Sequence, residues 1–255
     1  MLIDELLTYL FDGQAHPLTT PIATWLASSR RFTTFVTTFR DKIRKKLRTM
    51  QEQERLHDLR LELETAYLLL QERSLSLVYE PPQCGQVRCP DFAVTFTTSL
   101  TFMVEVTRLR AVQNRTSAHA QAQARATPSP DTALTFPLVG EHLADAMCSK
   151  LGQLLPQRSN VLLVGVDAPC PTHSDLHAAM LRVQQRAERH DSILLRRYRF
   201  RDHADFFRHY QRLSEILVRG SQLQADGPVV VWVNPQAKHP LPGKVRTVLY
   251  HSHTA

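Results

Sequence analysis

Two short β-rich runs, joined by a connection of hairpin length, constrain the fold of this chain more than any other feature. Residues 92–96 (Phe-Ala-Val-Thr-Phe) and 100–104 (Leu-Thr-Phe-Met-Val) are rich in β-branched and aromatic residues, which is typical of strands. Only residues 97–99 (Thr-Thr-Ser) lie between them, so the two runs are predicted to pair as a hairpin. Asp91 opens the first run and Glu105 ends the second. The hairpin therefore brings two carboxylates together at one end of a sheet.

The pairing of these two acids predicts a cation between them. Two carboxylates held a few ångströms apart repel each other unless a positive charge compensates them. Their oxygens are ligands of the kind that suit Mg²⁺. Asp91 and Glu105 are therefore candidate ligands of Mg²⁺ or Mn²⁺.

The remaining patterns predict an α/β protein. Apolar residues at helical spacing predict helices at residues 2–11, 20–28, 29–48, 52–72, 140–155, 173–189 and 203–218. Strand patterns lie at residues 75–80, 92–96, 100–105, 160–166, 229–234 and 245–250. The run 160–166 is apolar almost throughout, which favours a central strand covered on both faces. We therefore expect a mixed central sheet flanked by helices.

A signature of a known family coincides with the acidic pair. Pro90-Asp91, followed by Glu105-x-Thr107, resembles the motif of the PD-(D/E)xK nuclease superfamily, which has the restriction-endonuclease-like fold. In that superfamily the two acids bind Mg²⁺, and a Lys two residues after the second acid positions or activates the attacking water. Thr107 stands where that Lys would be, so the catalytic cation must come from elsewhere. The family core runs helix, strand, strand, strand, helix, strand, the order predicted for residues 55–167.

The resemblance also implies a domain organisation. It places an α/β core of restriction-endonuclease-like type in residues 55–255, after an N-terminal helical extension in residues 1–54. Residues 111–137 are rich in Ala, Gln, Ser, Thr and Pro and are expected to form a flexible insert. This insert follows the second acidic strand directly, so it is either a lid over a substrate or a tolerated surface loop.

Further site residues follow from the resemblance. A Glu on the helix before the first core strand often joins the metal site, which implies Glu62 first, because it lies nearer the apolar stripe, and Glu64 second. Lys150, on the helix predicted at 140–155, is the candidate for a relocated catalytic cation. Thr107 can position water but carries no charge. Both glutamates are equally compatible with an ordinary exposed helix surface.

The charge of the chain favours a polyanionic partner. Its 31 Lys and Arg residues exceed its 24 Asp and Glu residues, which gives a formal net charge of +7. Basic surfaces attract nucleic acid because phosphate contacts release counterions. The candidate nucleic-acid-binding residues are Arg40, Arg44, Lys45, Lys46, Arg108, Arg110, Arg196, Arg197 and Arg199. Alternatively, the first four lie on the solvated face of a packed helix, and residues 192–201 form an edge strand with snorkelling arginines.

Three hypotheses about function remain open from the sequence. The first is a metal-dependent nuclease that hydrolyses phosphodiester bonds, with DNA as the expected substrate. The second is a degenerate nuclease-like domain that binds nucleic acid without cutting it. The third is an unrelated α/β protein, in which Asp91 is a turn residue and Glu105 is a buried partner for Arg108 or Arg110.

The sequence also sets expectations about location and assembly. Acidic residues near the start of the chain differ from the basic start of a signal peptide, and no apolar run reaches the ~18 residues that span a bilayer. We therefore expect a cytoplasmic protein without membrane contact. Many members of the superfamily are dimers, so the resemblance allows a homodimer, although no segment shows a clear dimer seam.

Overall fold

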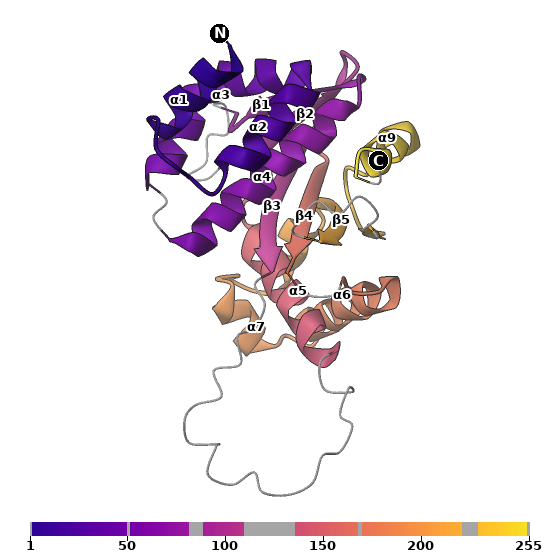
Figure 1. The fold of residues 1–255 in the computed structure, drawn as a ribbon. Coiled ribbons are helices and arrows are strands. Elements are labelled where there is room, and N and C mark those ends of the chain that lie inside the picture. Colours follow the sequence, from indigo (N-terminus) through magenta and orange to yellow (C-terminus); the bar gives the residue numbers. More distant parts are fainter. Residues whose placement is uncertain are drawn as a thin grey trace, which may run out of the picture.

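The fold is an α/β architecture built on one open, mixed sheet of six strands. The computed structural model describes residues 2–49, 52–81, 89–109, 136–167, 170–220 and 229–253. The strands lie side by side in the order of the sequence (Figure 1). They are β1 Leu75–Tyr79, β2 Phe92–Phe96, β3 Leu100–Leu109, β4 Asn160–Val166, β5 Leu213–Gly220 and β6 Val230–Val233. Strands β3, β4 and β5 are parallel to one another, and the other neighbours pair antiparallel, which confirms the predicted mixed sheet.

The hairpin predicted from the sequence is present as β2 and β3. Phe92 pairs with Val104 and Phe96 with Leu100. Thr97 turns the chain with a positive φ of 54°, and the backbone N–H of Thr97 donates to the carbonyl of Ser74 at 2.7 Å. The short connection therefore fixes the register that the candidate site depends on.

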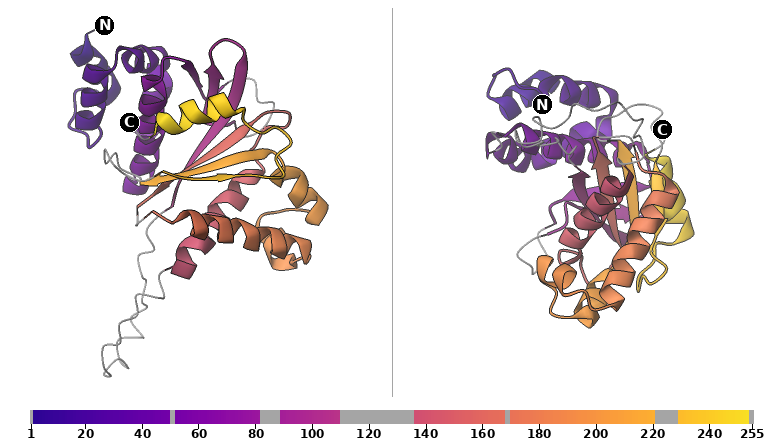
Figure 2. Two further views of the ribbon diagram at one scale, coloured as in Figure 1. Left: turned by 90° about the vertical axis from the view of Figure 1, so that its right-hand side faces the viewer. Right: turned by 90° about the horizontal axis from the view of Figure 1, so that it is seen from below.

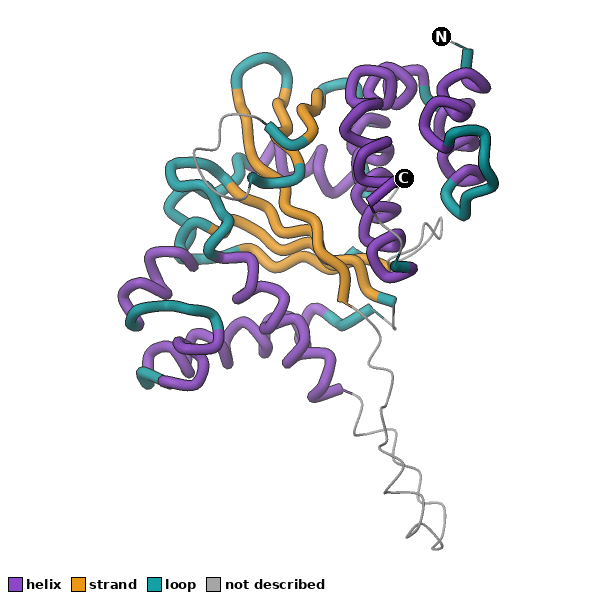
Figure 3. The backbone as a smooth tube through the Cα atoms, turned by 90° about the vertical axis from the view of Figure 1, so that its left-hand side faces the viewer, coloured by secondary structure: helices purple, strands orange, loops and turns teal. Residues whose placement is uncertain are grey.

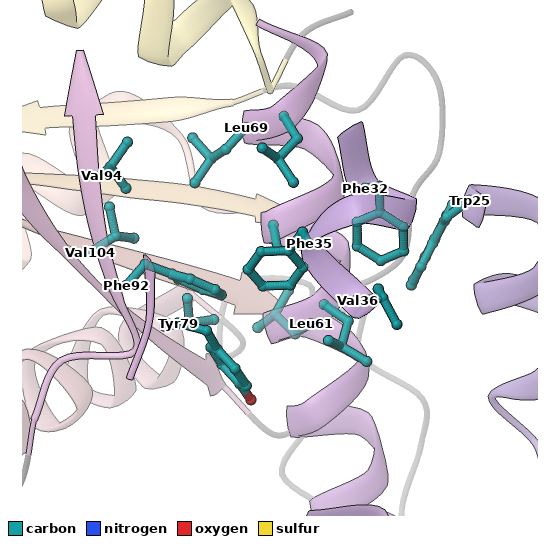
Figure 4. Close-up of a cluster of buried hydrophobic side chains, with 14 of the residues drawn as sticks. Trp25, Phe32, Phe35, Val36, Leu61, Leu69, Tyr79, Phe92, Val94 and Val104 are labelled. Carbon is teal, nitrogen blue, oxygen red and sulfur yellow. The ribbon is translucent and has the colours of Figure 1, made fainter. Parts of the chain in front are cut away.

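One face of the sheet is covered by the N-terminal helices and by the last helix. These are α1 Ile3–Phe11, α2 Thr19–Ser28, α3 Arg30–Thr49, α4 Gln53–Gln71 and α9 Gly243–His251 (Figure 2). Their apolar sides form one core with the sheet, in which aromatic rings pack at the centre. Figure 4 shows Phe35 of α3 beside Tyr79 and Phe92 of the sheet, with Phe32 on the other side of Phe35, all of them buried.

The opposite face is covered by the helices that follow β3 and β4. These are α5 Phe136–Leu151, α6 His173–Glu188, α7 Ser192–Arg197 and α8 His203–Tyr210, so the sheet lies between two helical layers (Figure 3). Strand β4 is buried along its whole length, as expected of a central strand with parallel neighbours. None of the helices in the described ranges is both long and apolar enough to cross a membrane.

A glycine lets helix α4 approach the sheet closely. A Cβ built on Gly165 of β4 would lie 2.6 Å from a methyl carbon of Leu61 on α4, closer than real Cβ contacts. Any larger residue at this position would push Leu61 outward. Because Glu62 follows Leu61 on the same helix, Gly165 also helps to set the position of Glu62 beside the sheet.

Two predictions and one alternative interpretation from the sequence are wrong in the C-terminal part of the chain. The helix predicted at 203–218 ends at Tyr210, and the apolar run from Leu213 is the strand β5. The strand predicted at 245–250 is the helix α9. Residues 192–197 form the helix α7, capped by the Asp191 side chain, which accepts from the backbone N–H of Ile193 at 2.9 Å, so the edge-strand interpretation fails. Short apolar runs do not distinguish a helix from a strand by periodicity alone, and the packing decides.

Two further elements differ from their predictions in detail. The predicted buried strand at 229–234 is β6, which lies at the edge of the sheet, and Trp232 is its buried residue. Helix α5 begins at Phe136, so the predicted insert at 111–137 shares its last two residues with this helix. The rest of that insert, residues 111–135, lies outside the described residues.

Candidate functional site

The structure brings the two acids of the hairpin together. The register of β2 and β3, continued by one residue from Phe92 and Val104, places Asp91 opposite Glu105. Directly opposed residues in an antiparallel pair have Cβ atoms about 4.5–5.5 Å apart. Asp91 Oδ2 accepts the backbone N–H of Val106 at 2.7 Å, and the backbone N–H of Asp91 hydrogen-bonds the Glu105 carboxylate. These reciprocal bonds hold both carboxylates on one face of the sheet.

Lysine 150 reaches the same place from helix α5. Lys150 Nζ lies 2.5 Å from Glu105 Oε1. Glu105 itself is buried, and Lys150 is partly exposed toward the neighbouring cavity. Strand alternation explains the meeting, because odd-numbered residues of β3 face α5 while Val104 and Val106 face the opposite core. Lys150 and Glu105 are therefore in contact, as expected from the sequence.

The environment disfavours the ionised forms of both acids. Burial raises the pKa of Asp91 well above its ordinary value, and the nearby carboxylates of Glu62 and Glu105 raise it further. Burial also raises the pKa of Glu105, against the opposing effect of Lys150. Two lysines, Lys150 at Glu105 and Lys46 at Glu62, thus face three acids. A divalent cation would relieve this repulsion and lower both pKa values.

The structure distinguishes the two candidate glutamates of helix α4. Glu62 lines the cavity beside Asp91, and its Oε2 accepts from Lys46 Nζ and the Tyr79 hydroxyl, each at 2.7 Å. Glu64 is fully buried elsewhere and binds Arg219 of β5 through its Oε1 at 2.8 Å. Glu62 therefore accompanies the acidic pair, whereas Glu64 belongs to an interior ion pair.

A cavity of about 760 Å³ opens beside the acids. It is bordered by α4, by the ends of β2 and β3, and by α5 and α7. Glu62, Asp91 and Lys150 lie along its wall, together with Thr107, the residue at the motif Lys position. The other lining residues are Arg55, Asp58, Leu61, Val106, Arg108, Leu109, His142, Asp145, Ala146, Ser149, Arg197 and Tyr198.

Arg108 lies in this wall but is committed to carboxylates. Its side chain is 4% exposed and binds Asp58 at 3.0 Å, together with Glu54 and Asp167. Arg108 thus ties α4 to the ends of β3 and β4, and it points away from Glu105, as strand alternation predicts. The predicted role of Arg108 in binding nucleic acid competes with these three ion pairs. Arg110, the other arginine of this segment, lies outside the described residues.

The basic cluster of helix α3 is also largely engaged within the protein. Arg44 binds Asp12, and its guanidinium lies 4.3 Å from the centre of the Tyr9 ring. Arg40 lies 5.3 Å from the same ring. Lys46 binds Glu62 and also Glu80, the latter at 2.8 Å. Among the four candidates on this helix, Lys45 projects into solvent.

The arginines around α7 differ in their relation to the cavity. Arg197 lines it and binds Asp145 of α5 at 2.5 Å, while Arg196 and Arg199 are exposed and lie outside its lining. Sequence reasoning missed Asp145, which also lines the cavity and accepts from the Tyr198 hydroxyl. The adjacent basic and aromatic residues around α7 indicate this surface in the sequence. The contact with Asp145 on α5 depends on how the two helices pack, which the sequence pattern does not show.

Two carboxylates on one face are a donor set that Mg²⁺ accepts, because Mg²⁺ commonly uses one or two protein carboxylates with waters and substrate phosphates. Asp91 and Glu105 fit that requirement. Across the described ranges, no three His, Cys, Asp or Glu side chains converge on one point as metal ligands do. Glu62 therefore acts on the pair through its charge. No protein-family model, curated protein sequence or solved structure matches this chain.

Proposed function

We propose that this protein is a metal-dependent nuclease that hydrolyses phosphodiester bonds of nucleic acid. The observation that carries the proposal is the arrangement of Asp91 opposite Glu105, with Lys150 Nζ 2.5 Å from Glu105 Oε1, beside an open cavity. Two acids and one lysine are the three functional groups of the PD-(D/E)xK motif. Here the lysine comes from the following helix in place of the motif position, which is Thr107.

The topology around the site supports this proposal. Helix α4, strands β1 to β3, helix α5 and strand β4 follow one another in the order of a restriction-endonuclease-like core. The first three strands are antiparallel, and β3 and β4 are parallel, so the acids lie where a hairpin meets the central strands. Because the fold alone does not define a function, the proposal rests on the site.

Asp91 and Glu105 would hold Mg²⁺ or Mn²⁺ at the wall of the cavity. When bound, the cation would neutralise charge at the scissile phosphate and lower the pKa of a bound water. The backbone N–H of Val106 keeps the Asp91 carboxylate oriented for this purpose. Glu62, held by Tyr79 and Lys46, adds negative charge that favours cation binding without occupying the same point.

Lys150 would supply the positive charge that Thr107 cannot. Its ammonium group is held beside the acids by Glu105 and stands at the cavity wall, where it can stabilise negative charge on a phosphate or on an attacking hydroxide. Thr107 lines the same cavity, and its hydroxyl can orient a water. This division of roles makes Lys150 essential for hydrolysis and Thr107 auxiliary.

A second candidate function is a nucleic-acid-binding domain that does not cut. The observation that favours it is the direct pairing of Lys150 with Glu105, since the ammonium group already compensates one of the two carboxylates. In that case the ion pair is structural and divalent cations add nothing. Of the two arginines in the third hypothesis from the sequence, Arg108 is bound to three other acids, and Lys150 takes its place at Glu105.

Cleavage of plasmid and single-stranded DNA with Mg²⁺ or Mn²⁺ tests the proposal. Wild type is expected to cut, and Asp91→Asn and Lys150→Met are expected to lose at least about 100-fold in rate, as when a transition-state charge contact is removed. Asp41→Asn, a matched change at a side chain that is 79% exposed, should cut like wild type. Cutting that survives in purified Asp91→Asn, or no cutting by wild type, contradicts the proposed hydrolysis.

A further inference from the structure

A second cavity adjoins the first, and one side-chain bridge separates them. The second cavity measures about 440 Å³ and lies between α5, α6 and α7. Both cavities are lined by His142, Asp145, Arg197 and Tyr198. Asp145 Oδ2 accepts from Arg197 Nη2 at 2.5 Å, and Asp145 Oδ1 accepts from the Tyr198 hydroxyl. The two spaces therefore form one path along α5, divided at Asp145.

The second cavity has a basic rim. Arg182, Arg186 and Arg197 line it, against the acids Glu141 and Asp145. All three arginines are exposed; Arg186 is paired with Asp191, which accepts from Arg186 Nε at 2.7 Å, and Arg197 is paired with Asp145. Exposed arginines along this path are suited to phosphate contacts, because the guanidinium group binds phosphate through several N–H donors.

The floor of the same cavity is apolar and includes an aromatic ring. Val183 and Leu194 lie in its lining, and the ring of Tyr198 stands between the two cavities. Arg197 lies 5.5 Å from the centre of this ring. Basic side chains beside an aromatic ring are the combination with which proteins bind single strands, through phosphate contacts and base stacking.

The length of the path and its aromatic ring suit a single strand. Lys150 and Glu141 are nine residues apart on α5, about 14 Å at the helical rise, which is long enough for a short run of nucleotides. Because Tyr198 can stack on a base only where that base is not already stacked in a duplex, the site is expected to take a single strand.

We propose that the second cavity binds the segment of a single nucleic-acid strand next to the phosphate held at Lys150. Arg182 and Arg197 contact its phosphates, and Tyr198 stacks on one of its bases. This inference deepens the proposed function and rests on it for the class of ligand. The Asp145 carboxylate disfavours binding of the strand, because it holds Arg197 and adds negative charge to the path. The ion pair between Asp145 and Arg197 therefore breaks when the strand binds.

Binding of a fluorescein-labelled oligothymidine strand, measured by fluorescence anisotropy in EDTA, tests this strand site without cleavage. Arg182→Gln and Arg197→Gln should each weaken binding about three- to tenfold and reduce the salt dependence by about 0.7 per lost phosphate contact. Arg189→Gln, at the end of α6, and Arg158→Gln are the controls, since both arginines are exposed and neither lines either of these two cavities. The controls should bind like wild type.

A gain of affinity provides the sharper test. Asp145→Asn keeps an acceptor for the Tyr198 hydroxyl but removes the charge that holds Arg197, so it should bind the strand about threefold more tightly or better. A purely structural bridge predicts equal or weaker binding. Equal thermal unfolding of the variants excludes misfolding as a cause. Arginine variants that bind like their controls, together with an Asp145→Asn variant that gains nothing, overturn the strand site.

The outcomes separate this inference from the proposed hydrolysis. Asp91→Asn should keep strand binding while losing cleavage. If wild type does not cut but binding depends on Arg182 and Arg197, the strand site stands and the hydrolysis fails. If cutting depends on Asp91 while the arginine variants behave like their controls, the hydrolysis stands and the strand site fails. A duplex competitor as effective as the single strand also overturns it.

Discussion

Two buried glutamates of the same sheet form similar ion pairs with different consequences. Glu105 of β3 binds Lys150 of α5, and Glu215 of β5 binds Arg246 of α9, each at 2.5 Å. Both acids are buried, and both cations come from a helix that covers the sheet. The local chemistry is thus nearly identical. An ion pair between a strand glutamate and a covering helix does not by itself indicate a functional site.

The surroundings of the two pairs differ. Glu215 also accepts from the Tyr250 hydroxyl at 2.7 Å, so both of its oxygens serve to fasten α9 to the sheet. Glu105 instead faces Asp91 across the strands, and the cavity opens beside them. One acid is balanced by its neighbours, whereas the other lies in an excess of negative charge. Uncompensated charge next to an open cavity is what marks a candidate site.

The largest expected effect is on stability at the structural pair. Glu215→Ala leaves Arg246 without its partner in a partly buried position and is expected to lower the free energy of unfolding by about 3 kcal/mol. Glu105→Gln removes a carboxylate whose ionised form burial already disfavours, so it should change stability by less than about 1 kcal/mol while abolishing cleavage. Urea denaturation measures both values. Similar losses of stability in the two variants would erase the contrast between the pairs.

A smaller effect, of opposite sign, is expected at Asp91. Replacing it with Asn removes a carboxylate that burial and two acids disfavour, so the variant should be about 1 kcal/mol more stable than wild type near pH 7. A carboxyl group whose pKa is raised in the folded state binds more protons there than in the unfolded state. The stability that Asp91 contributes through this difference in pKa is therefore present below its pKa in the unfolded chain, about 3.9. It is lost as pH rises through the pKa of Asp91 in the folded protein.

The advantage of Asp91→Asn should accordingly grow as pH rises from about 4 toward the raised folded pKa of Asp91. Thermal unfolding of the two proteins over a series of pH values measures this difference. An advantage that stays constant with pH, or that shrinks as pH rises, contradicts the direction of the pKa shift.

The smallest effect is expected at Glu62. Glu62→Gln retains an oxygen for the Tyr79 hydroxyl and weakens the ion pair with Lys46, which should change stability by only about 0.5 kcal/mol. Because Glu62 favours the cation through charge alone, the variant should need more Mg²⁺ for half-maximal cleavage and keep its maximal rate. A Mg²⁺ titration of the cleavage rate separates these two quantities. A lost maximal rate at saturating Mg²⁺ would make Glu62 a direct participant.

The residues of the candidate site could be predicted from the sequence more fully than the ion pairs around it. Asp91 and Glu105 follow from strand patterns and a short connection, and Lys150 follows from the resemblance, which allows the lysine to come from the next helix. The partners of Glu64 and Arg108 could not be predicted, because Arg219 is 155 residues from Glu64 and Asp167 is 59 residues from Arg108. Such pairs depend on the order in which helices and strands pack, which local periodicity does not contain.

The misassigned segments have the same physical origin. The run from Leu213 has the apolar content of a buried helix or a buried strand, and its place between β4 and β6 decides for the strand. Residues 245–250 contain β-branched residues, yet Val245 and Leu249 are buried four residues apart, as on one face of a helix. In both cases the local preference for a helix or a strand was overridden by packing against the neighbouring elements of the fold.

The most direct test of the account is a crystal structure grown with saturating Mn²⁺ and examined by anomalous scattering. The account predicts a manganese peak about 2.2 Å from oxygens of both Asp91 and Glu105, with Lys150 Nζ shifted off Glu105 Oε1, and no peak at the Glu215–Arg246 pair. An empty map at the two acids, with Lys150 still bound to Glu105, would contradict it and make the first ion pair as structural as the second.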